Sequence, residues 1–337
     1  MKNVLVDMKI HDQGLGKLQA ISGVNVTLVP EPAEIKRPLP AELIEDKHIL
    51  FCSTPAENFS DMKSIEFIQI ASAGYSQLFG LSLVEKKVRA CNARGVFDVP
   101  IAEWNVSMMV NLARNLRQMI RNQQTGTWDR SAVFQREIRG SVVGLWGYGS
   151  IARETARLAK QMGMKVHVMD IAGVNPFKNI YSVPGTGDSE GKLPDKVFSV
   201  DQKKEFLSGL DYLILAMPLT KNTEGIVGEE DLKALPRHAF LLNPARGPLI
   251  KEQSLLKALR EGWITGAALD THYHYPMPAD HPLWRFPNVI MTPHISGSSL
   301  SPHFTERIWD IFCQNVQRYI LGKPLLNELS PRQLDGQ

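Results

Sequence analysis

Three polar residues in the second half of the chain directly follow apolar stretches, at places where strands are expected to end. They are Arg246, Asp270 and His294. A guanidinium can hold carboxylate and carbonyl oxygens through paired hydrogen bonds. An imidazole can give a proton to a developing alkoxide and take one back in the reverse direction. These residue types therefore favour the interconversion of a carbonyl and a hydroxyl group on a small acid.

A glycine-rich turn lies upstream of these residues. The apolar stretch 141–146 predicts a strand, which runs into Gly147, Gly149, Ser150 and Ile151, where a helix is expected to begin. The first glycine permits a tight turn, and the second lets the backbone approach a pyrophosphate. The N–H groups at the start of the helix then face the phosphates, assisted by the helix dipole. The segment predicts a dinucleotide-binding site.

The type of dinucleotide is indicated by Asp170, which ends the next predicted strand, about 20 residues after the glycine turn. A carboxylate at this point accepts hydrogen bonds from a ribose 2′-hydroxyl and repels a 2′-phosphate. The next two residues are Ile171 and Ala172, so no arginine follows to bind that phosphate. The sequence favours NAD over NADP.

The elements that must position these groups alternate along the whole chain. Strands are predicted at 3–7, 24–29, 48–53, 67–72, 88–92, 141–147, 165–170, 197–200, 212–217, 239–243, 265–270 and 289–292, with helical patterns between many of them. Several of these strands are apolar on both faces, as parallel strands covered by helices are. The alternation predicts an α/β fold with two doubly wound parallel sheets. Because ligands bind beyond the carboxyl ends of such strands, we expect the three polar residues to converge there.

Two longer patterns suggest the domain limits. Residues 100–123 carry one apolar stripe at helical spacing, and 302–321 predict a final helix that could return to pack on the first domain. We therefore expect one domain from 1–99 and 299–337 and another from 100–298. Between the expected strands, 175–196 is rich in Gly, Pro and Asp and predicts a long surface loop.

Composition narrows the class of protein. The chain has 337 residues, 43% of them hydrophobic, and a formal net charge of +3, which favours an ordinary globular protein that does not bind nucleic acid. No apolar stretch approaches the length of a membrane span. The cysteines, Cys52, Cys91 and Cys313, lie far apart in apolar surroundings. They are interpreted as buried reduced thiols of a cytoplasmic protein.

Taken together, these motifs resemble the D-isomer-specific 2-hydroxyacid dehydrogenase family. The resemblance runs nearly from end to end and is densest from Gly140 to Ser298. It implies a flavodoxin-like substrate domain, a Rossmann NAD-binding domain, and an NAD-dependent enzyme similar to glyoxylate and hydroxypyruvate reductases. The substrate would be a small 2-keto or D-2-hydroxy acid. The family is usually dimeric, with the 100–123 helix in the interface, so a homodimer is expected.

The resemblance also implies roles for residues. His294 would be the acid/base, Arg246 would bind the substrate, and the turn formed by Ala73, Gly74 and Tyr75 would offer N–H groups to the substrate carboxylate. The residues expected to bind the cofactor are Gly147, Gly149, Ser150, Ile151, Asp170, Pro218, Thr223, Asn243, Ala245, Asp270 and Gly297. Among them, Asp270 could hold the nicotinamide carboxamide.

One position departs from the family. Where a glutamate usually contacts the catalytic histidine, this chain has Tyr275, which we assign to the catalytic set. A carboxylate favours the imidazolium, whereas a phenol adds no charge at neutral pH. We therefore expect the pH profile of keto-acid reduction to lie lower than in relatives that carry glutamate.

Alternatives to this interpretation remain. The stretch around Tyr275 and His294 is also similar to formate dehydrogenases, which carry a neutral glutamine beside the histidine. An NAD-sensing regulator of the same fold is a second alternative, although retention of both Arg246 and His294 argues for catalysis. His272 and His274 could suggest a metal with His294, but no acidic or cysteine cluster accompanies them, so no metal is predicted.

Overall fold

The computed structural model describes residues 1–132 and 135–335 of the chain. They divide into two compact units: Met1–Phe97 with Lys178–Pro184 and Ser299–Gln337, and Asp98–Phe177 with Gly185–Ser298. The short segment Lys178–Pro184 thus packs with the first unit, although the sequence placed it within 100–298. Positions 133–134 and 336–337 of the expected domains lie outside the described residues. Which unit binds which ligand stays a prediction at this point.

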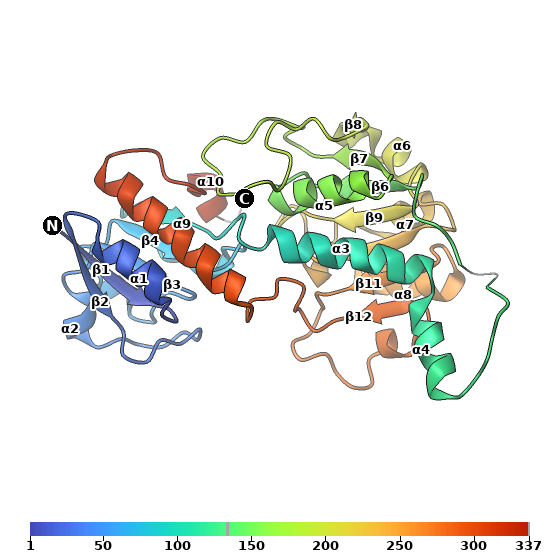
Figure 1. Ribbon diagram of the computed structural model, residues 1–337, viewed down its shortest axis with the longest axis horizontal. Helices are drawn as coiled ribbons and strands as arrows, with labels where there is room; N and C mark the ends of the chain where they lie inside the picture. The colour runs from blue at the N-terminus through green and yellow to red at the C-terminus, as the bar shows by residue number, and fades with distance from the viewer. Residues whose placement is uncertain (133–134, 336–337) are drawn as a thin grey trace. The chain divides into compact units, whose positions relative to one another are not determined.

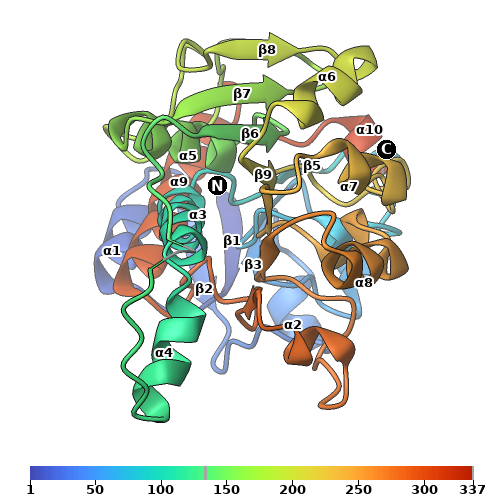
Figure 2. The ribbon, with the colours of Figure 1, turned by 90° about the vertical axis from the view of Figure 1, so that its right-hand side faces the viewer.

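The first unit is built on a parallel sheet. Its strands, in the order β2-β1-β3-β4-β5, are β1 (Lys2–Asp7), β2 (Val24–Leu28), β3 (Ile49–Cys52), β4 (Phe67–Ile70) and β5 (Arg89–Cys91). This 2-1-3-4-5 order is the flavodoxin-like one. Helices α1 (Asp12–Gln19) and α9 (Pro302–Ile320) cover one face, and α2 (Ala41–Ile44) lies on the other (Figures 1 and 2).

The final long helix, α9, seals this unit as the sequence predicts. Trp309 and Phe312 are fully buried on α9. Phe312 stacks on Phe51 of β3 with ring centroids 4.1 Å apart, and Trp309 meets the same ring edge-on at 5.4 Å. Such aromatic pairs add to the stabilisation that burial alone provides. One face of this core is therefore completed by residues that lie about 260 positions after Phe51 in the sequence.

The second unit contains the larger sheet, with its strands in the order β12-β11-β10-β9-β6-β7-β8, all parallel. The strands are β6 (Val142–Trp146), β7 (Lys165–Met169), β8 (Lys196–Phe198), β9 (Tyr212–Leu215), β10 (Phe240–Asn243), β11 (Gly266–Leu269) and β12 (Val289–Met291). Figure 2 shows β8, β7 and β6 in succession along one side. The six strands that come first in the chain, β6 to β11, follow the Rossmann order. In that fold the ligand crevice lies where the strand order reverses, which is between β6 and β9 here.

Helices cover both faces of the second sheet. One face carries α3 (Asp98–Ala113) and α5 (Ser150–Gln161), and the other carries α6 (Lys203–Ser208), α7 (Glu229–Ala234) and α8 (Glu252–Glu261), as Figure 2 shows. All twelve predicted strands are present in the described residues, and the fold class is confirmed. Two all-parallel sheets place every strand's carboxyl end at one edge of its sheet.

The helix predicted over 100–123 is wrong in one respect, because it is two helices. The chain leaves helical geometry at Asn115, whose φ is +48°, and α4 (Leu116–Gln124) begins in a new direction. Arg117 of α4 donates to the carbonyl of Phe286 at 2.6 Å. This contact fixes α4 near the edge strand β12 rather than along the axis of α3.

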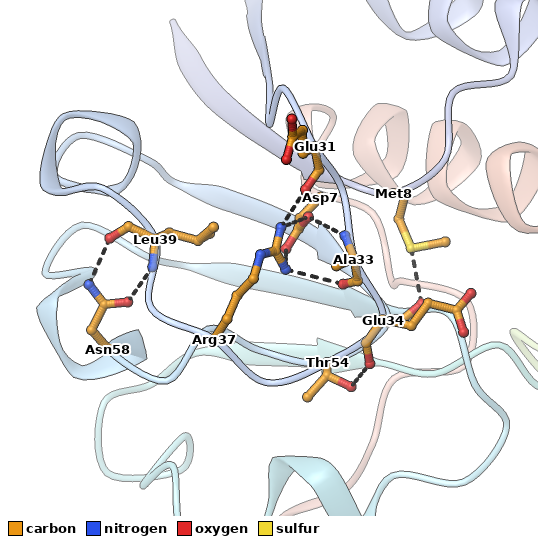
Figure 3. A network of polar contacts seen from close by, with 10 residues as sticks. Asp7, Met8, Glu31, Ala33, Glu34, Arg37, Leu39, Thr54 and Asn58 are labelled. Carbon is orange, nitrogen blue, oxygen red and sulfur yellow. Dashed lines mark hydrogen bonds and ion pairs between the residues drawn. The ribbon is translucent and has the colours of Figure 1, made fainter.

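At the carboxyl edge of the first sheet, an ion pair with a buried carboxylate organises the connection between β2 and α2 (Figure 3). Asp7, the last residue of β1, accepts two hydrogen bonds from Arg37, at 2.9 and 3.1 Å. The same guanidinium donates to the carbonyls of Glu31 and Ala33, and Thr54 donates to the carbonyl of Glu34. A proline-rich connection without helix or strand is thereby held in one conformation.

The three cysteines are free and buried, as the sequence predicts. Burial raises the pKa of each thiol, to about 11 for Cys313. They are therefore uncharged core residues near neutral pH. Among the described residues, no helix is long and apolar enough to cross a membrane.

Candidate active site

The glycine turn after β6 has the close packing that the sequence predicts. Gly147 adopts a φ of +96°, and a Cβ there would lie 2.8 Å from the carbonyl oxygen of Ala216, just after β9. Only glycine satisfies both conditions. Gly149 then caps α5 without a side-chain hydrogen bond, and the helix begins at Ser150. Because Gly149 has no side chain, it does not compete for the N–H groups at this helix start, which suits the turn to a phosphate.

Asp170 lies just after β7, next to the same turn. One carboxylate oxygen accepts from the backbone N–H of Tyr148 at 2.7 Å and the other from Ala172 at 2.8 Å. Each oxygen keeps a further lone pair. The side chain is half-buried and fixed by the backbone, so it can accept hydrogen bonds from a sugar hydroxyl. The geometry at the glycine turn thus fits a dinucleotide.

Several other expected cofactor residues prove to shape turns at the ends of β9 and β10. The Thr223 hydroxyl donates to the carbonyl of Pro218 at 2.7 Å and accepts from the N–H of Thr220. Asn243 is buried; its amide donates to the carbonyl of Arg246 at 2.8 Å, and its oxygen accepts from Ala245 and Arg246. Both residues therefore hold backbone in place at the carboxyl edge, whatever contacts they make to a ligand.

Arg246 is positioned by the turn after β10 and by a close approach of two chain segments. A Cβ on the next residue, Gly247, would lie 2.5 Å from the carbonyl carbon and oxygen of His272. The absence of a side chain at Gly247 brings the arginine against the segment that carries Tyr275. The guanidinium donates to its neighbouring carbonyl of Ala245 at 2.6 Å. Burial lowers the pKa of Arg246, and Tyr275 acts in the opposite direction. Because the pKa of a free guanidinium is very high, Arg246 stays charged near neutral pH.

Asp270 directs the loop that carries His294. The carboxylate is fully buried and accepts from the Thr292 hydroxyl, from the N–H of Ile295 at 3.0 Å, and from both the N–H and the hydroxyl of Ser296. These partners use both oxygens of the Asp270 carboxylate. The expected contact to the carboxamide stays a prediction, and the structure favours a positioning role for Asp270.

His294 itself adopts a left-handed backbone conformation, with a φ of +58°. This costs a non-glycine residue roughly 1–2 kcal/mol. The conformation is held by its N–H, which donates to the carbonyls of Asp270 at 2.7 Å and Thr292 at 3.0 Å. Residues held in such backbone regions occur often at functional sites. The loop therefore presents the imidazole at the edge of the sheet in one defined orientation.

Tyr275 meets His294, as the sequence predicts for the position that replaces glutamate. The phenol oxygen lies 3.1 Å from Nδ1 of the imidazole, and the two rings pack edge to face at 5.6 Å. The same oxygen accepts from the backbone N–H of His272 at 3.3 Å. Unlike a carboxylate, a hydroxyl can either donate to Nδ1 or accept from it. Tyr275 can therefore accompany either neutral tautomer of His294.

The pKa of His294 is lowered from that of a free histidine. The largest cause is loss of hydration to the surrounding protein, followed by the positive charge of Arg246, while Asp270 acts in the opposite direction. Arg246 is thus close enough for its charge to be felt at the imidazole. The structure brings Arg246, Tyr275 and His294 together at the carboxyl edge of the second sheet.

In the first unit, the turn 73–75 follows β4. Asn92 donates to the carbonyl of Ala73 at 2.7 Å, and the Ser72 hydroxyl donates to the carbonyl of Gly74 at 2.7 Å. The backbone carbonyls of this turn are thus occupied. Among the residues described, the N–H groups of Ala73, Gly74 and Tyr75 donate no hydrogen bond. This turn can offer them to an anion.

Sequence reasoning missed the residues that position the site from behind. Thr292 receives a hydrogen bond from the indole of Trp104 at 3.1 Å and donates its own hydroxyl proton to Asp270. Ser296 satisfies the other Asp270 oxygen. The clue available in the sequence was a pair of hydroxyl residues flanking the expected histidine. Their partner on α3 could not be read from local spacing.

Comparison with known proteins now decides the family. Residues 106–296 match the model described as "D-isomer specific 2-hydroxyacid dehydrogenase, NAD binding domain". The chain belongs to the D-isomer specific 2-hydroxyacid dehydrogenase family. It is thus a member of a family of NAD-dependent enzymes, and the matched range covers the glycine turn, Asp170, Arg246 and His294.

Relatives and solved structures agree with this family. The chain is 27% identical to a glyoxylate reductase of Thermofilum pendens over 288 residues, 83% of this chain and 80% of that protein. It is 27% identical to a hydroxypyruvate reductase of Blautia hydrogenotrophica over 80% of each chain. A family member from Aeromonas salmonicida has a similar crystal structure, with a TM-score of 0.79 and 25% identity over 98% of this chain and 99% of that one.

Proposed function

We propose that this enzyme interconverts a small 2-keto acid and the corresponding D-2-hydroxy acid with NAD(H), using His294 for the proton and Arg246 to hold the acid. The observation that carries the proposal is the grouping of Arg246, Tyr275 and His294 on loops that buried polar contacts fix. A fixed guanidinium beside an ionisable imidazole matches what a keto acid requires.

The proposed cofactor is NAD rather than NADP. Gly147, Gly149, Ser150 and Ile151 would hold the pyrophosphate, and Asp170 the adenosine ribose. When bound, the reduced nicotinamide supplies a hydride to the keto carbon. Because Asp170 is fixed by two backbone N–H groups, its negative charge would meet any 2′-phosphate at close range.

Arg246 acts on the acid. Its charged fork would hold the substrate carboxylate and polarise the carbonyl oxygen, which makes the carbon more electrophilic. The N–H groups of the 73–75 turn are the second proposed anchor for the carboxylate.

His294 transfers the proton. In reduction, the imidazolium gives its Nε2 proton to the developing alkoxide, and Nδ1–H then donates to the oxygen of Tyr275. In oxidation, the neutral ring takes the hydroxyl proton at Nε2 while Nδ1–H keeps the same contact. Asp270 and Ser296 hold the loop that carries His294, so they act as positioning residues for the imidazole, and Asp270 stays the proposed partner of the nicotinamide carboxamide.

Homodimer formation through the α3–α4 region is also proposed. Leu116, Ile120 and Trp284 are each more than 40% exposed and line an apolar depression of about 400 Å³ with β12. Such an exposed apolar surface is typical of an interface. Sedimentation velocity on the chain and on an Ile120→Glu variant would test this. A monomeric mass for the unchanged chain would refute it.

The buried reduced thiols fit a cytoplasmic location.

A screen tests the function. NADH oxidation is measured with glyoxylate, hydroxypyruvate, pyruvate and larger 2-keto acids, and NAD reduction with formate. We expect turnover with at least one keto acid, a loss of about 10²–10⁴-fold in kcat for His294→Gln, and normal rates for the exposed control His303→Gln. For Arg246→Lys we expect a loss of about 10²-fold in kcat/KM.

Two outcomes would replace the proposal. Formate oxidation without keto-acid reduction would favour the formate alternative, which the neutral Tyr275 contact supports because formate oxidation needs no proton transfer. Tight NADH binding without turnover of any acid would favour an NAD-sensing regulator.

A further inference from the structure

A second group of ionisable side chains lies in the same unit as the proposed active site, apart from Arg246 and His294. It consists of Glu252 at the start of α8, His274, and His281 just before η5 (Pro282–Arg285). One ligand atom from each residue lies within 4.8 Å of the others. In the described part of the chain, this is the group of histidine and carboxylate side chains close enough to share an ion.

The three side chains differ in how firmly they are held. His281 is buried, and its Nε2 lies 2.6 Å from a carboxylate oxygen of Glu252. Its Nδ1 accepts the N–H of Leu283, so Nε2 is the nitrogen that faces the carboxylate. His274 is exposed and places its ring centroid 6.2 Å from that of His281. Two ligands are thus fixed, and the third can move.

A second observation points to the same place. The Tyr273 hydroxyl is buried, and among the described residues it makes no hydrogen bond. Glu252 lies close enough for its charge to act on this hydroxyl. A buried polar atom without a partner is costly, and a bound water or ion is a common explanation.

From this grouping we propose that Glu252, His274 and His281 form a binding site for one divalent transition-metal ion, best suited to zinc. Two imidazoles and one carboxylate are ligands that Zn²⁺ prefers, whereas Ca²⁺ and Mg²⁺ prefer oxygen alone. Ligands about 2.0–2.1 Å from a tetrahedral ion lie roughly 3.4 Å apart. To reach this spacing, the Glu252 oxygen and Nε2 of His281, now 2.6 Å apart, must separate by roughly 0.8 Å. The exposed His274 closes the remaining gap, and water can occupy the fourth position.

This set differs from the group of His272, His274 and His294 that was considered from the sequence. His272 is unavailable, because it is buried and its Nε2 contacts the carbonyl of Thr292 at 2.8 Å. His294 is engaged with Tyr275. Since His274 directly precedes Tyr275, the ion would tie the segment that meets His294 to α8. The ion-binding site itself does not depend on the proposed dehydrogenase reaction.

The test is calorimetric titration of the metal-free, untagged full chain with Zn²⁺, supported by the visible absorption of bound Co²⁺. We expect one ion per chain, with the intense Co²⁺ bands of four- or five-coordinate geometry. His274→Ala should weaken binding at least ~10-fold. That residue is exposed, so its removal leaves the fold intact. The matched control is His238→Ala, another exposed histidine near a carboxylate, which should bind like the unchanged chain.

The titration can support or overturn the proposed metal site, and it does not depend on NADH turnover. Absence of stoichiometric binding, equal affinity in His274→Ala, or an equal loss in His238→Ala would overturn the proposal. Glu252→Gln provides a second check, because it keeps the shape of the side chain and should also weaken binding. Thermal unfolding of each variant confirms that the fold is retained.

Discussion

The pKa of His294 can be moved by changing its neutral partner. In a Tyr275→Glu variant, a carboxylate replaces the phenol that now lies 3.1 Å from Nδ1. Glutamate is shorter than tyrosine, so its charge would lie about 5 Å from the ring. At that distance, opposite unit charges attract by roughly 0.8 kcal/mol in water, or about 0.6 pKa unit. The partly covered site lowers the effective dielectric, so we expect a rise of about 0.6–1.2 units.

The sign of the effect follows from the direction of the reaction. Keto-acid reduction needs the imidazolium, so its rate is full below the pKa of His294 and is lost above it. That pKa is lowered in the unchanged chain. As the pH is raised, the rate of reduction should therefore begin to fall at a lower pH than it would with a free histidine. Tyr275→Glu should shift the decline to higher pH. Oxidation, which needs the neutral ring, should show the opposite limb.

The assay is kcat/KM for NADH-dependent reduction across a pH series at low ionic strength. Tyr275→Gln is the matched control, since it has the length of glutamate without the charge. If the glutamate and glutamine variants share one pH profile, His294 does not donate the proton or Tyr275 does not adjoin it in solution. Added salt should shrink the difference, because the tyrosine position is 59% exposed.

Two further predictions concern the turns that frame the site. Gly247→Ala should cost about 1–3 kcal/mol in the free energy of unfolding, because a Cβ meets the His272 carbonyl at 2.5 Å. Thermal unfolding would measure it, and Gly209→Ala, where a Cβ meets nothing within 4 Å, should be neutral. In a variant with both Asp170→Ser and Ile171→Arg, the kcat/KM ratio of NADH to NADPH should fall at least ~10-fold. The exposed Ile171 tolerates this change, and an unchanged ratio would remove Asp170 from the cofactor site.

Much of the fold could be predicted because its causes are local. Strands such as Tyr212–Leu215 are apolar on both faces, which only a covered parallel strand allows. Gly147 and Asp170 follow their strands at the spacing that a Rossmann turn needs, so the NAD-binding type of domain was visible in the sequence. The contact of Tyr275 with His294 was predicted from resemblance and is present.

What the sequence could not supply depends on contacts between distant segments. The break at Asn115 rests on one residue in a left-handed conformation inside an otherwise helical pattern. Thr292 and Ser296 reach the Asp270 oxygens only in the folded unit, so the part that Asp270 plays in holding the His294 loop was not visible in the sequence. The grouping of Glu252 with two histidines more than twenty residues away is likewise a product of packing.

The helix α9, which covers one face of the first sheet, is synthesised long after the strands of that sheet. During synthesis, the strands of the first sheet are complete by Cys91, but Trp309 and Phe312 follow about 220 residues later. At roughly 5–20 residues per second, that interval is about 10–40 s. The whole of the second unit leaves the ribosome during this wait. The first sheet must therefore keep much of one apolar face uncovered while the second unit folds, so a nascent chain stalled before Pro302 should depend on chaperones.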